Sequence, residues 1–235
     1  MKKFLTLFVL AVTLVSNAQE SVLLRLNYEK GTKYTMKMDM SQGQMTMAMK
    51  ANVNVVAAEG DTYTTETKFL KVTVDVFAGG TMMSFDSDTS DDDLDEFGQQ
   101  VKSQMGPMLE AVVTSTSNSL GKVIEIKAEP DFQGASDMGK QSNIVFPKKA
   151  VKVGSTWNME KDQNGSKVNF TYTVKSILKD KVILELSGKS AEADISGSMD
   201  IDRKSGIPLK SVVNMNISAG GQEMKSTITT QMIKM

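Results

Sequence analysis

The sequence predicts a mainly β protein, with a curved antiparallel sheet of half-barrel or sandwich-like form and a central amphipathic helix. Three observations predict this class. Long stretches are rich in Thr, Val, Tyr and Phe, which strands favour, and apolar and polar residues partly alternate along them. Short links that contain glycine separate these stretches, as expected of antiparallel hairpins. One further stretch places its apolar residues at helical spacing instead.

The first element along the chain, residues 1–18, is expected to be a signal peptide that is not part of the fold. Two lysines precede an unbroken apolar run of 12 residues at 4–15, and the small-residue stretch "SNA" ends at Ala18. This order is typical of a secretory signal, and the run is shorter than the ~20 residues that span a bilayer. We therefore expect an exported protein, periplasmic or extracellular, with an uncleaved anchor as the alternative.

The amino-acid composition excludes several classes of function. The chain has no cysteine, so we expect neither a lipid anchor nor a disulfide. It has no histidine either, which excludes Ser-His-Asp and Cys-His catalysis and most zinc sites. Without the two lysines of the signal, 25 basic residues face 28 acidic ones, and this net charge of −3 argues against nucleic acid as a partner. We expect no cofactor and, after signal cleavage, no transmembrane segment.

Strand signals fill most of the remaining chain. The stretch "TYTTETKFLKVTVDVF" at 62–77 is a clear example, and turn residues follow each such stretch closely. Strands of this length joined by tight links imply antiparallel meanders. The clearest predicted strands are 62–77, 167–178, 181–188, 211–218 and 224–235, and the predicted links are 41–44, 58–61, 178–181, 203–208 and 219–222.

One stretch breaks the strand pattern and predicts the helix. In "LDEFGQQVKSQM" (94–105), four apolar residues follow one another at spacings of 3, 4 and 4 residues, which forms a stripe along one side of a helix. We expect the helix to begin after Ser90, whose hydroxyl can cap it, and to stop at Gly106 and Pro107. A second, weaker helix is expected near 131–142.

A faint internal repeat suggests how the chain is organised. "KGTKYTMKMD" (30–39) and "VGSTWNMEKD" (153–162) are 123 residues apart. Both contain Gly, an aromatic residue three positions later, Met two positions after that and Asp three positions after the Met. We interpret the mature chain as two related β-meanders, 19–149 with a helical insert and 150–235, which form one cooperative unit. Chance similarity between two strand openings rich in Thr and Lys is the alternative.

The most informative pattern is a series of methionines in "YTMKMDMSQGQMTMAMK" (34–50), at every second position on either side of "SQGQ". Side chains two residues apart share one face of a strand, so a hairpin closed at "SQGQ" would place the whole series on one face, which Tyr34 extends. Burying one methionine stabilises a protein by roughly 1.5–3 kcal/mol, so the face is expected to be covered. The series, called the methionine ladder below, is Met36, Met38, Met40, Met45, Met47 and Met49.

Three interpretations of the ladder are open. It is core, packed on another sheet or on the helix; or it lines an adaptable apolar groove, because methionine is flexible and polarisable; or its thioethers bind Cu(I), which prefers soft sulfur ligands. Copper sites of this kind usually include His or Cys, and the chain has neither. The candidate ligand-binding residues are therefore the ladder, Tyr34 and Trp157. For Trp157, a core position at a strand start is the competing interpretation.

Other motifs do not amount to a catalytic or metal site. The acidic stretch 86–97 resembles a calcium loop but lacks its Gly and its final Glu, so a solvated loop is expected. A carboxylate hydrolase would pair Asp39 with Glu66 or Asp75, but nothing in their spacing favours this over a solvated face. We therefore predict no catalytic residue and no metal site.

Three segments resemble a known group of proteins. "FPKKAVKVGSTW" (146–157), "KGTKY" (30–34) and "DIDRKSGIPLKS" (200–211) are similar to secreted bacterial β-rich proteins of a domain family of unknown function. The D-x-x-x-G-x-P turn in the last segment also resembles the curved-sheet lipoprotein carriers of the periplasm, LolA and LolB. That similarity is at the level of the fold and implies no catalytic residues.

Together these patterns predict an exported, non-enzymatic envelope protein. We expect it to bind an apolar ligand, such as a lipid or acyl chain, or an envelope partner, on a concave sheet lined by methionine. The alternatives are a structural or adhesive surface protein, a methionine-rich Cu(I)-binding protein and a carboxylate-based hydrolase.

Overall fold

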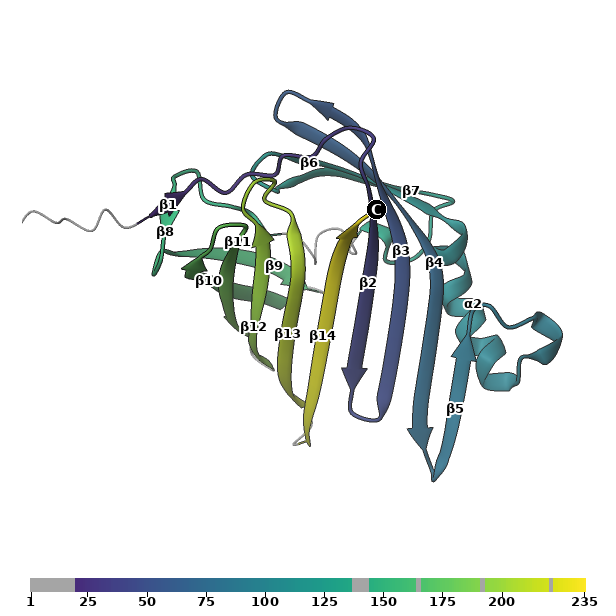
Figure 1. Cartoon of the computed structure of the whole chain (residues 1–235). Coiled ribbons are helices and arrows are strands. Elements are labelled where there is room, and N and C mark those ends of the chain that lie inside the picture. The colour runs from purple at the N-terminus through teal and green to yellow at the C-terminus, as the bar shows by residue number, and fades with distance from the viewer. Residues whose placement is uncertain (1–19, 137–143, 164–165, 191–192, 220–221) are drawn as a thin grey trace, which may run out of the picture.

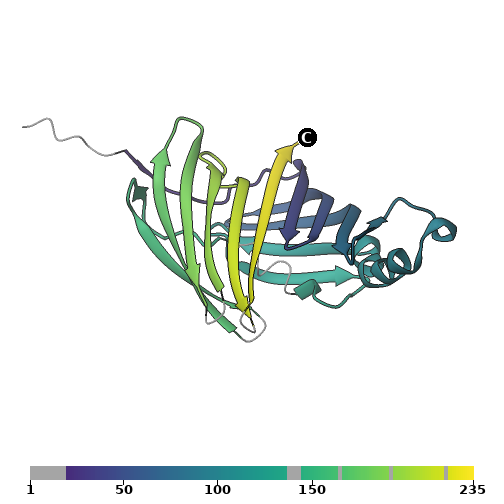
Figure 2. The same cartoon turned by 90° about the horizontal axis from the view of Figure 1, so that it is seen from below.

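One large curved sheet dominates the protein in the computed structural model (Figure 1). The view from below shows the curve of the sheet and the helix at one end of it (Figure 2). The predicted signal peptide, residues 1–18, lies outside the described residues. The structure describes residues 20–136, 144–163, 166–190, 193–219 and 222–235.

The secondary structure is mostly strand, as predicted. All of the strands predicted above are present, with ends that differ by a few residues at most. The elements in chain order are β1 (Ser21–Val22), β2 (Lys33–Gln42), β3 (Met45–Glu59), β4 (Thr62–Ala78), β5 (Thr81–Asp86), η1 (Asp91–Asp93), α2 (Glu96–Glu110), β6 (Val112–Asn118), β7 (Val123–Glu129), β8 (Val151–Lys152), β9 (Thr156–Gln163), β10 (Ser166–Ile177), β11 (Lys181–Lys189), β12 (Ala193–Asp202), β13 (Pro208–Ala219) and β14 (Gln222–Lys234).

The main sheet has 12 antiparallel strands in the order β7-β6-β4-β3-β2-β14-β13-β12-β11-β10-β9, with β5 paired to β4 beside this path. Two meanders, β2 to β7 and β9 to β14, lie side by side in it and join where β14 pairs with β2. The sheet does not close into a barrel, because β7 and β9 remain its two ends. The predicted mainly β class with a curved antiparallel sheet is confirmed.

The two repeated segments adopt the same turn at the start of each meander. The amide of Gly31 donates to the carbonyl of Val55 at 2.8 Å, and Val55 donates back to the residue after Gly31 at 2.9 Å. In the second meander, Gly154 donates to the carbonyl of Val174 at 2.8 Å, and Val174 donates back to Ser155, the residue after Gly154, at 2.9 Å. Both glycines have positive φ, 85° and 83°, a conformation that favours glycine. This shared turn supports an internal duplication.

The start of the helix was predicted wrongly. Helix α2 begins at Glu96, and Asp95 caps it by accepting a hydrogen bond from the amide of Gly98 at 2.7 Å. Ser90 does not cap α2, because its hydroxyl donates to the carboxylate of Asp93 at 2.6 Å within the short 3₁₀ turn η1. Asp91, Asp92 and Asp93 therefore form a separate turn ahead of the helix.

The end of the helix was also predicted wrongly. Pro107 lies inside α2, which continues to Glu110 instead of stopping at Gly106. The side chain of Met108 in this extra turn is only 6% exposed and is part of the core. Its burial outweighs the loss of the hydrogen bond that proline cannot donate. For the weaker helix predicted near 131–142, residues 131–134 are not helical and residues 137–142 lie outside the described residues.

The core lies on one side of the sheet, called the inner face below, and forms two clusters. The first cluster joins both meanders, since it contains Tyr34 and Val53 from β2 and β3 as well as Leu184 and Ile201 from β11 and β12. The second cluster belongs to the N-terminal meander and packs the apolar stripe of α2 against β3, β4 and β5. Each cluster covers a different part of the inner face.

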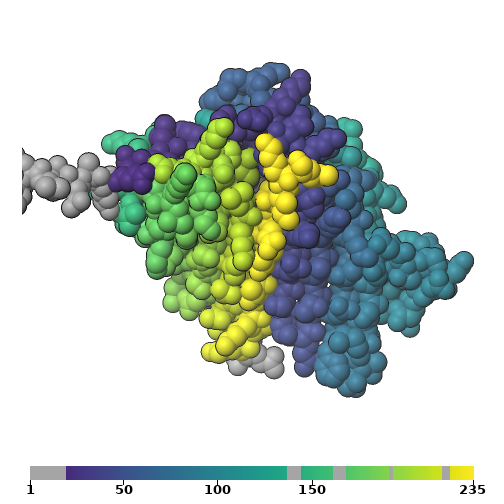
Figure 3. All heavy atoms as spheres, in the orientation of Figure 1, coloured from purple at the N-terminus to yellow at the C-terminus, as the bar shows by residue number. Residues whose placement is uncertain are grey.

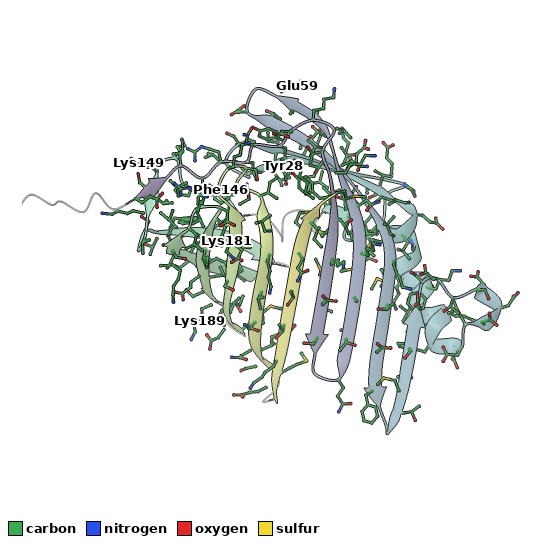
Figure 4. The ribbon with its side chains drawn as sticks, viewed as in Figure 1. Tyr28, Glu59, Phe146, Lys149, Lys181 and Lys189 are labelled. Carbon is green, nitrogen blue, oxygen red and sulfur yellow. The ribbon has the colours of Figure 1, made fainter. Side chains whose placement is uncertain are left out.

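Two loop segments cross one end of the sheet and complete the first cluster. Leu24 comes from the N-terminal segment and Phe146 from the segment before β8, and these side chains are 1% and 2% exposed. Figure 4 shows Tyr28 and Phe146 at this end of the molecule. The guanidinium of Arg25 donates to the carbonyls of Pro147 and Lys148 at 2.8 and 2.6 Å, which ties the two segments together.

Candidate ligand-binding face

The strand register places the whole methionine ladder on the inner face. In the hairpin of β2 and β3, Met38 stands opposite Met49 and Met40 opposite Met47, and directly opposed residues point to the same side. All six ladder side chains are half-buried, whereas the alternating Lys37 on β2 is exposed on the other side. The arrangement on one face agrees with the sequence pattern, and a role in ligand binding stays a prediction.

The core clusters cover the β3 row of the ladder and Met36 of the β2 row. Met45, Met47 and Met49 pack against the second cluster, and Met36 touches both clusters. Met38 and Met40 belong to neither cluster, although both are half-buried. The core interpretation therefore describes the β3 row and Met36, and Met38 and Met40 on β2 form a separate apolar surface.

The neighbouring strands extend this apolar surface. On β14, the residues opposite Met38 and Met40 are Thr230 and Ile228, and Ile228 is in turn opposite Val213 of β13. On the other side, the ladder residues of β3 face Val72 and Val74 of β4. The inner face thus presents mainly apolar side chains from β13 to β4, with Thr230 as a polar residue among them. From outside, the space-filling view shows these strands in close contact (Figure 3).

The two aromatic candidates lie apart. Tyr34 continues the β2 row of the ladder, is 6% exposed, and meets Tyr28 edge-on with ring centroids 6.2 Å apart. Trp157 lies on β9, the far end strand of the sheet, where it stacks on Tyr172 at 5.4 Å and donates from Nε1 to the carbonyl of Val145 at 3.0 Å. The structure therefore brings Tyr34 to the ladder and places Trp157 in the first core cluster.

Burial changes the acidity of the tyrosines around the first cluster. Loss of solvent raises the pKa of Tyr172 to about 12, and burial together with the neighbouring Tyr34 raises the pKa of Tyr28 to about 12. The pKa of Tyr34 is raised by burial first and then by the charges of Glu29 and Asp202. The folded protein therefore keeps phenolic protons that the unfolded chain would release near pH 10.

Replacing Tyr172 with phenylalanine is expected to reduce the fall in the free energy of unfolding at alkaline pH. Because the raised pKa makes the folded state bind more protons than the unfolded state above pH 10, stability falls between pH 10 and 12. Each such tyrosine contributes about 1.4 kcal/mol per pH unit. Urea unfolding at pH 9, 10 and 11 measures this slope, which should be smaller in Tyr172→Phe. Equal slopes in the two proteins would contradict the assignment.

The carboxylates considered for hydrolysis do not meet at the ladder. The register places Asp39, Glu66 and Asp75 on the outer face, opposite Ala48, Asn54 and Thr46 respectively. Glu66 and Asp75 lie at well separated positions of β4, so this arrangement gives the hydrolase alternative no support.

Two lysines pair with three carboxylates of the acidic loop. Lys71 lies 2.8 Å from Asp86 and 2.7 Å from Asp88, and Lys102 pairs with Asp91. The hydrogen bond from Lys71 lowers the pKa of the Asp86 carboxyl. Among the described residues, no group of three or more His, Cys, Asp or Glu side chains is arranged to hold a metal ion. The predicted solvated loop agrees with this pairing.

Two surface depressions lie away from the ladder. One, of about 530 Å³, is lined by Glu29–Lys33 together with Lys234 and Met235, and the other, of about 440 Å³, lies along α2. Neither borders a ladder residue. Within the described part of the chain, no helix has the length and hydrophobicity that crossing a bilayer requires.

Comparison with solved structures relates the fold to that of other β proteins. The chain resembles lipovitellin, in a structure concerned with its lipid–protein interactions, with a TM-score of 0.55 and 10% identity, over 89% of this chain and 25% of that one. The chain thus spans about a quarter of the length of this relative. At 10% identity, the likeness concerns the fold alone.

Two further structures match more weakly. A porin-like protein from Bacteroides uniformis gives a TM-score of 0.32 and 11% identity, over 89% of this chain and 99% of that one. A domain described as an outer membrane lipoprotein-sorting protein, from Vibrio parahaemolyticus, gives 0.25 and 10%, over 88% and 86%. Scores this low support no argument about either fold or function.

No curated protein matches the sequence. The predicted resemblance to a family of unknown function is confirmed, because residues 133–232 match the sequence model of such a family, DUF6263.

Proposed function

We propose that the protein is a non-enzymatic binding protein that holds an acyl chain or similar apolar ligand on the inner face of its sheet, at Met38 and Met40 of the methionine ladder. The single observation that carries the proposal is the position of Met38 and Met40. They continue the apolar inner face but pack into neither core cluster. A ligand that covered them would supply the contacts that the two core clusters of the described residues do not.

The chemistry of this surface suits a flexible apolar ligand. Methionine side chains are unbranched and polarisable, so they can repack around ligands of different shape. Ile228 of β14 and Val213 of β13 add apolar area beside the ladder. The charged residues Lys37 and Asp39 of β2 alternate to the outer face. The chain resembles lipovitellin in its fold, and the structure of lipovitellin concerns lipid–protein interactions, which supports a lipid as the ligand class. Export to the periplasm or cell exterior belongs to the proposal as well.

Native mass spectrometry of the protein, purified from the compartment to which it is exported, tests the proposal. We expect a bound mass of lipid size that organic extraction removes. A bound copper ion would instead favour the Cu(I) alternative. A protein without any bound mass, which also fails to take up a pyrene-labelled hydrocarbon after extraction, would contradict lipid binding.

A double substitution at Met38 and Met40 gives a second test. Replacing both Met38 and Met40 with alanine removes part of the apolar contact, and at roughly 25 cal/mol per Å² of buried surface this should weaken hydrocarbon binding about tenfold. Fluorescence titration with the pyrene-labelled hydrocarbon measures the effect. The matched control replaces Lys37 and Asp39, on the outer face of the same strand, with alanine, and should bind as the wild type does. Equal affinities in the two variants would place the ligand elsewhere.

A further inference from the structure

One end of the methionine ladder carries polar side chains. Gln42 follows Met40 on the inner face of β2 and stands opposite Ser226 of β14 and Met45 of β3. Ser226 is in turn opposite Met215 of β13. Two hydrogen-bonding groups therefore stand side by side where the apolar row ends.

Both groups lack a good partner within the described residues. Ser226 is 2% exposed, and its hydroxyl has no hydrogen-bond partner among them. The side-chain amide of Gln42 donates to the thioether sulfur of Met224 at 3.5 Å, and a thioether is a weak acceptor. Buried polar groups in proteins are almost always paired, so an unpaired hydroxyl calls for an explanation.

The surroundings indicate what the missing partner is. The inner-face neighbours Met40, Met45 and Met215 are apolar. The charged residues nearby in sequence, Asp39 and Lys225, are exposed and alternate to the outer face. A carboxylate or phosphate held here would be a buried charge without a counter-ion, which is strongly unfavourable. A neutral acceptor such as a carbonyl oxygen avoids this cost and can accept from both groups.

We propose that Gln42 and Ser226 bind the carbonyl oxygen of an ester- or amide-linked acyl group, whose hydrocarbon chain runs along Met40, Met38 and Met36 toward Tyr34. The inference rests on the proposed function, because the chain needs the apolar face. It adds the ligand class, a neutral acyl ester or amide in place of a free fatty acid, and its direction on the sheet. From Gln42 to Met36, where the core clusters begin, the strand extends about 20 Å at ~3.4 Å per residue, which is room for an acyl chain.

Three pyrene-labelled probes of equal chain length test the inference on the delipidated protein at pH 8: a hydrocarbon, a methyl ester and a free carboxylate. We expect the wild type to bind the ester most tightly. In Ser226→Ala, affinity for the ester should fall roughly three- to tenfold, the range for one hydrogen bond. Affinity for the hydrocarbon should not change. The matched control, Ser41→Ala, removes a hydroxyl from the exposed outer face of β2 and should leave the affinities for all three probes unchanged.

Thermal unfolding of the ligand-free protein separates binding from a structural role. Because the Ser226 hydroxyl lacks a partner in the described part of the chain, Ser226→Ala should keep or raise the melting temperature. A lower value would show that the hydroxyl supports the fold. If the hydrocarbon does not bind to the wild type, the proposed function itself fails. If it binds, but Ser226→Ala binds the ester as the wild type does, or if the carboxylate binds best, the assignment of a neutral acyl head is overturned.

Discussion

Replacing Gly206 with alanine is expected to lower the free energy of unfolding by about 3 kcal/mol or more. Gly206 has a φ of +67°, which costs a residue with a side chain roughly 1–2 kcal/mol. A Cβ atom at this position would also lie 2.1 Å from the carbonyl oxygen of Arg25. Relief of this clash must displace the N-terminal segment, and overpacking of this kind costs typically 1–3 kcal/mol.

The displaced segment matters because it closes the first core cluster. Leu24 and Leu26 on either side of Arg25 are buried, and the amide of Asn27 donates to the carbonyl of Ser205 at 2.8 Å. A shift at Arg25 therefore disturbs both the apolar contacts and the hydrogen bond that hold the segment to the turn before β13. The loss should appear as a lower midpoint of urea unfolding.

Gly60 provides the matched control for this substitution. Its φ is +60°, close to that of Gly206, but nothing lies within 4 Å of the position that its Cβ would take. Gly60→Ala should therefore cost only the backbone strain, roughly 1–2 kcal/mol. The difference between the two variants measures the close approach to Arg25. Equal costs would show that the N-terminal segment yields without resistance.

Replacing Leu184 with alanine is expected to lower the free energy of unfolding by roughly 2–5 kcal/mol, the usual range for a large side chain deleted from a core. Leu184 is 0% exposed and lies in the first cluster, which also contains Tyr34, Val53 and Tyr63 of the N-terminal meander. Because β14 pairs with β2 and this cluster spans both meanders, the loss should be felt by the whole chain. A loss shared by both meanders is the result expected if the chain forms one cooperative unit, as the sequence predicts.

Two probes, one in each meander, test that coupling. Trp157 emission reports on the C-terminal meander, and the chain has one tryptophan and no cysteine. A cysteine introduced as Val74→Cys, at a 4% exposed position of the second cluster, reports on the N-terminal meander through its protection from thiol labelling. In this background, Leu184→Ala should reduce the free energy measured by both probes equally. Unchanged thiol protection would mean that the meanders unfold independently.

The structure also shows why some elements were easier to predict than others. Strands such as β4 and β10 are rich in β-branched and aromatic residues, so their own composition identifies them. Most of β12 lacks this signal, and its Gly197 has no room for a side chain, since a Cβ would lie 2.2 Å from the carbonyl of Val212. Pairing with β11 on one side and β13 on the other makes this segment a strand.

The sequence alone determined the strand-rich class, the hairpins and the single face of the methionine ladder, because alternation along an extended chain is a local property that neighbours two residues away already fix. Tertiary structure decided the features that depend on distant contacts. Met108 draws α2 past Pro107, Trp157 is held in the core far from the ladder, and Met38 and Met40 are left outside both clusters. The pairing of β14 with β2, which sets Ser226 beside Gln42, joins residues 184 positions apart, and no local pattern encodes such a contact.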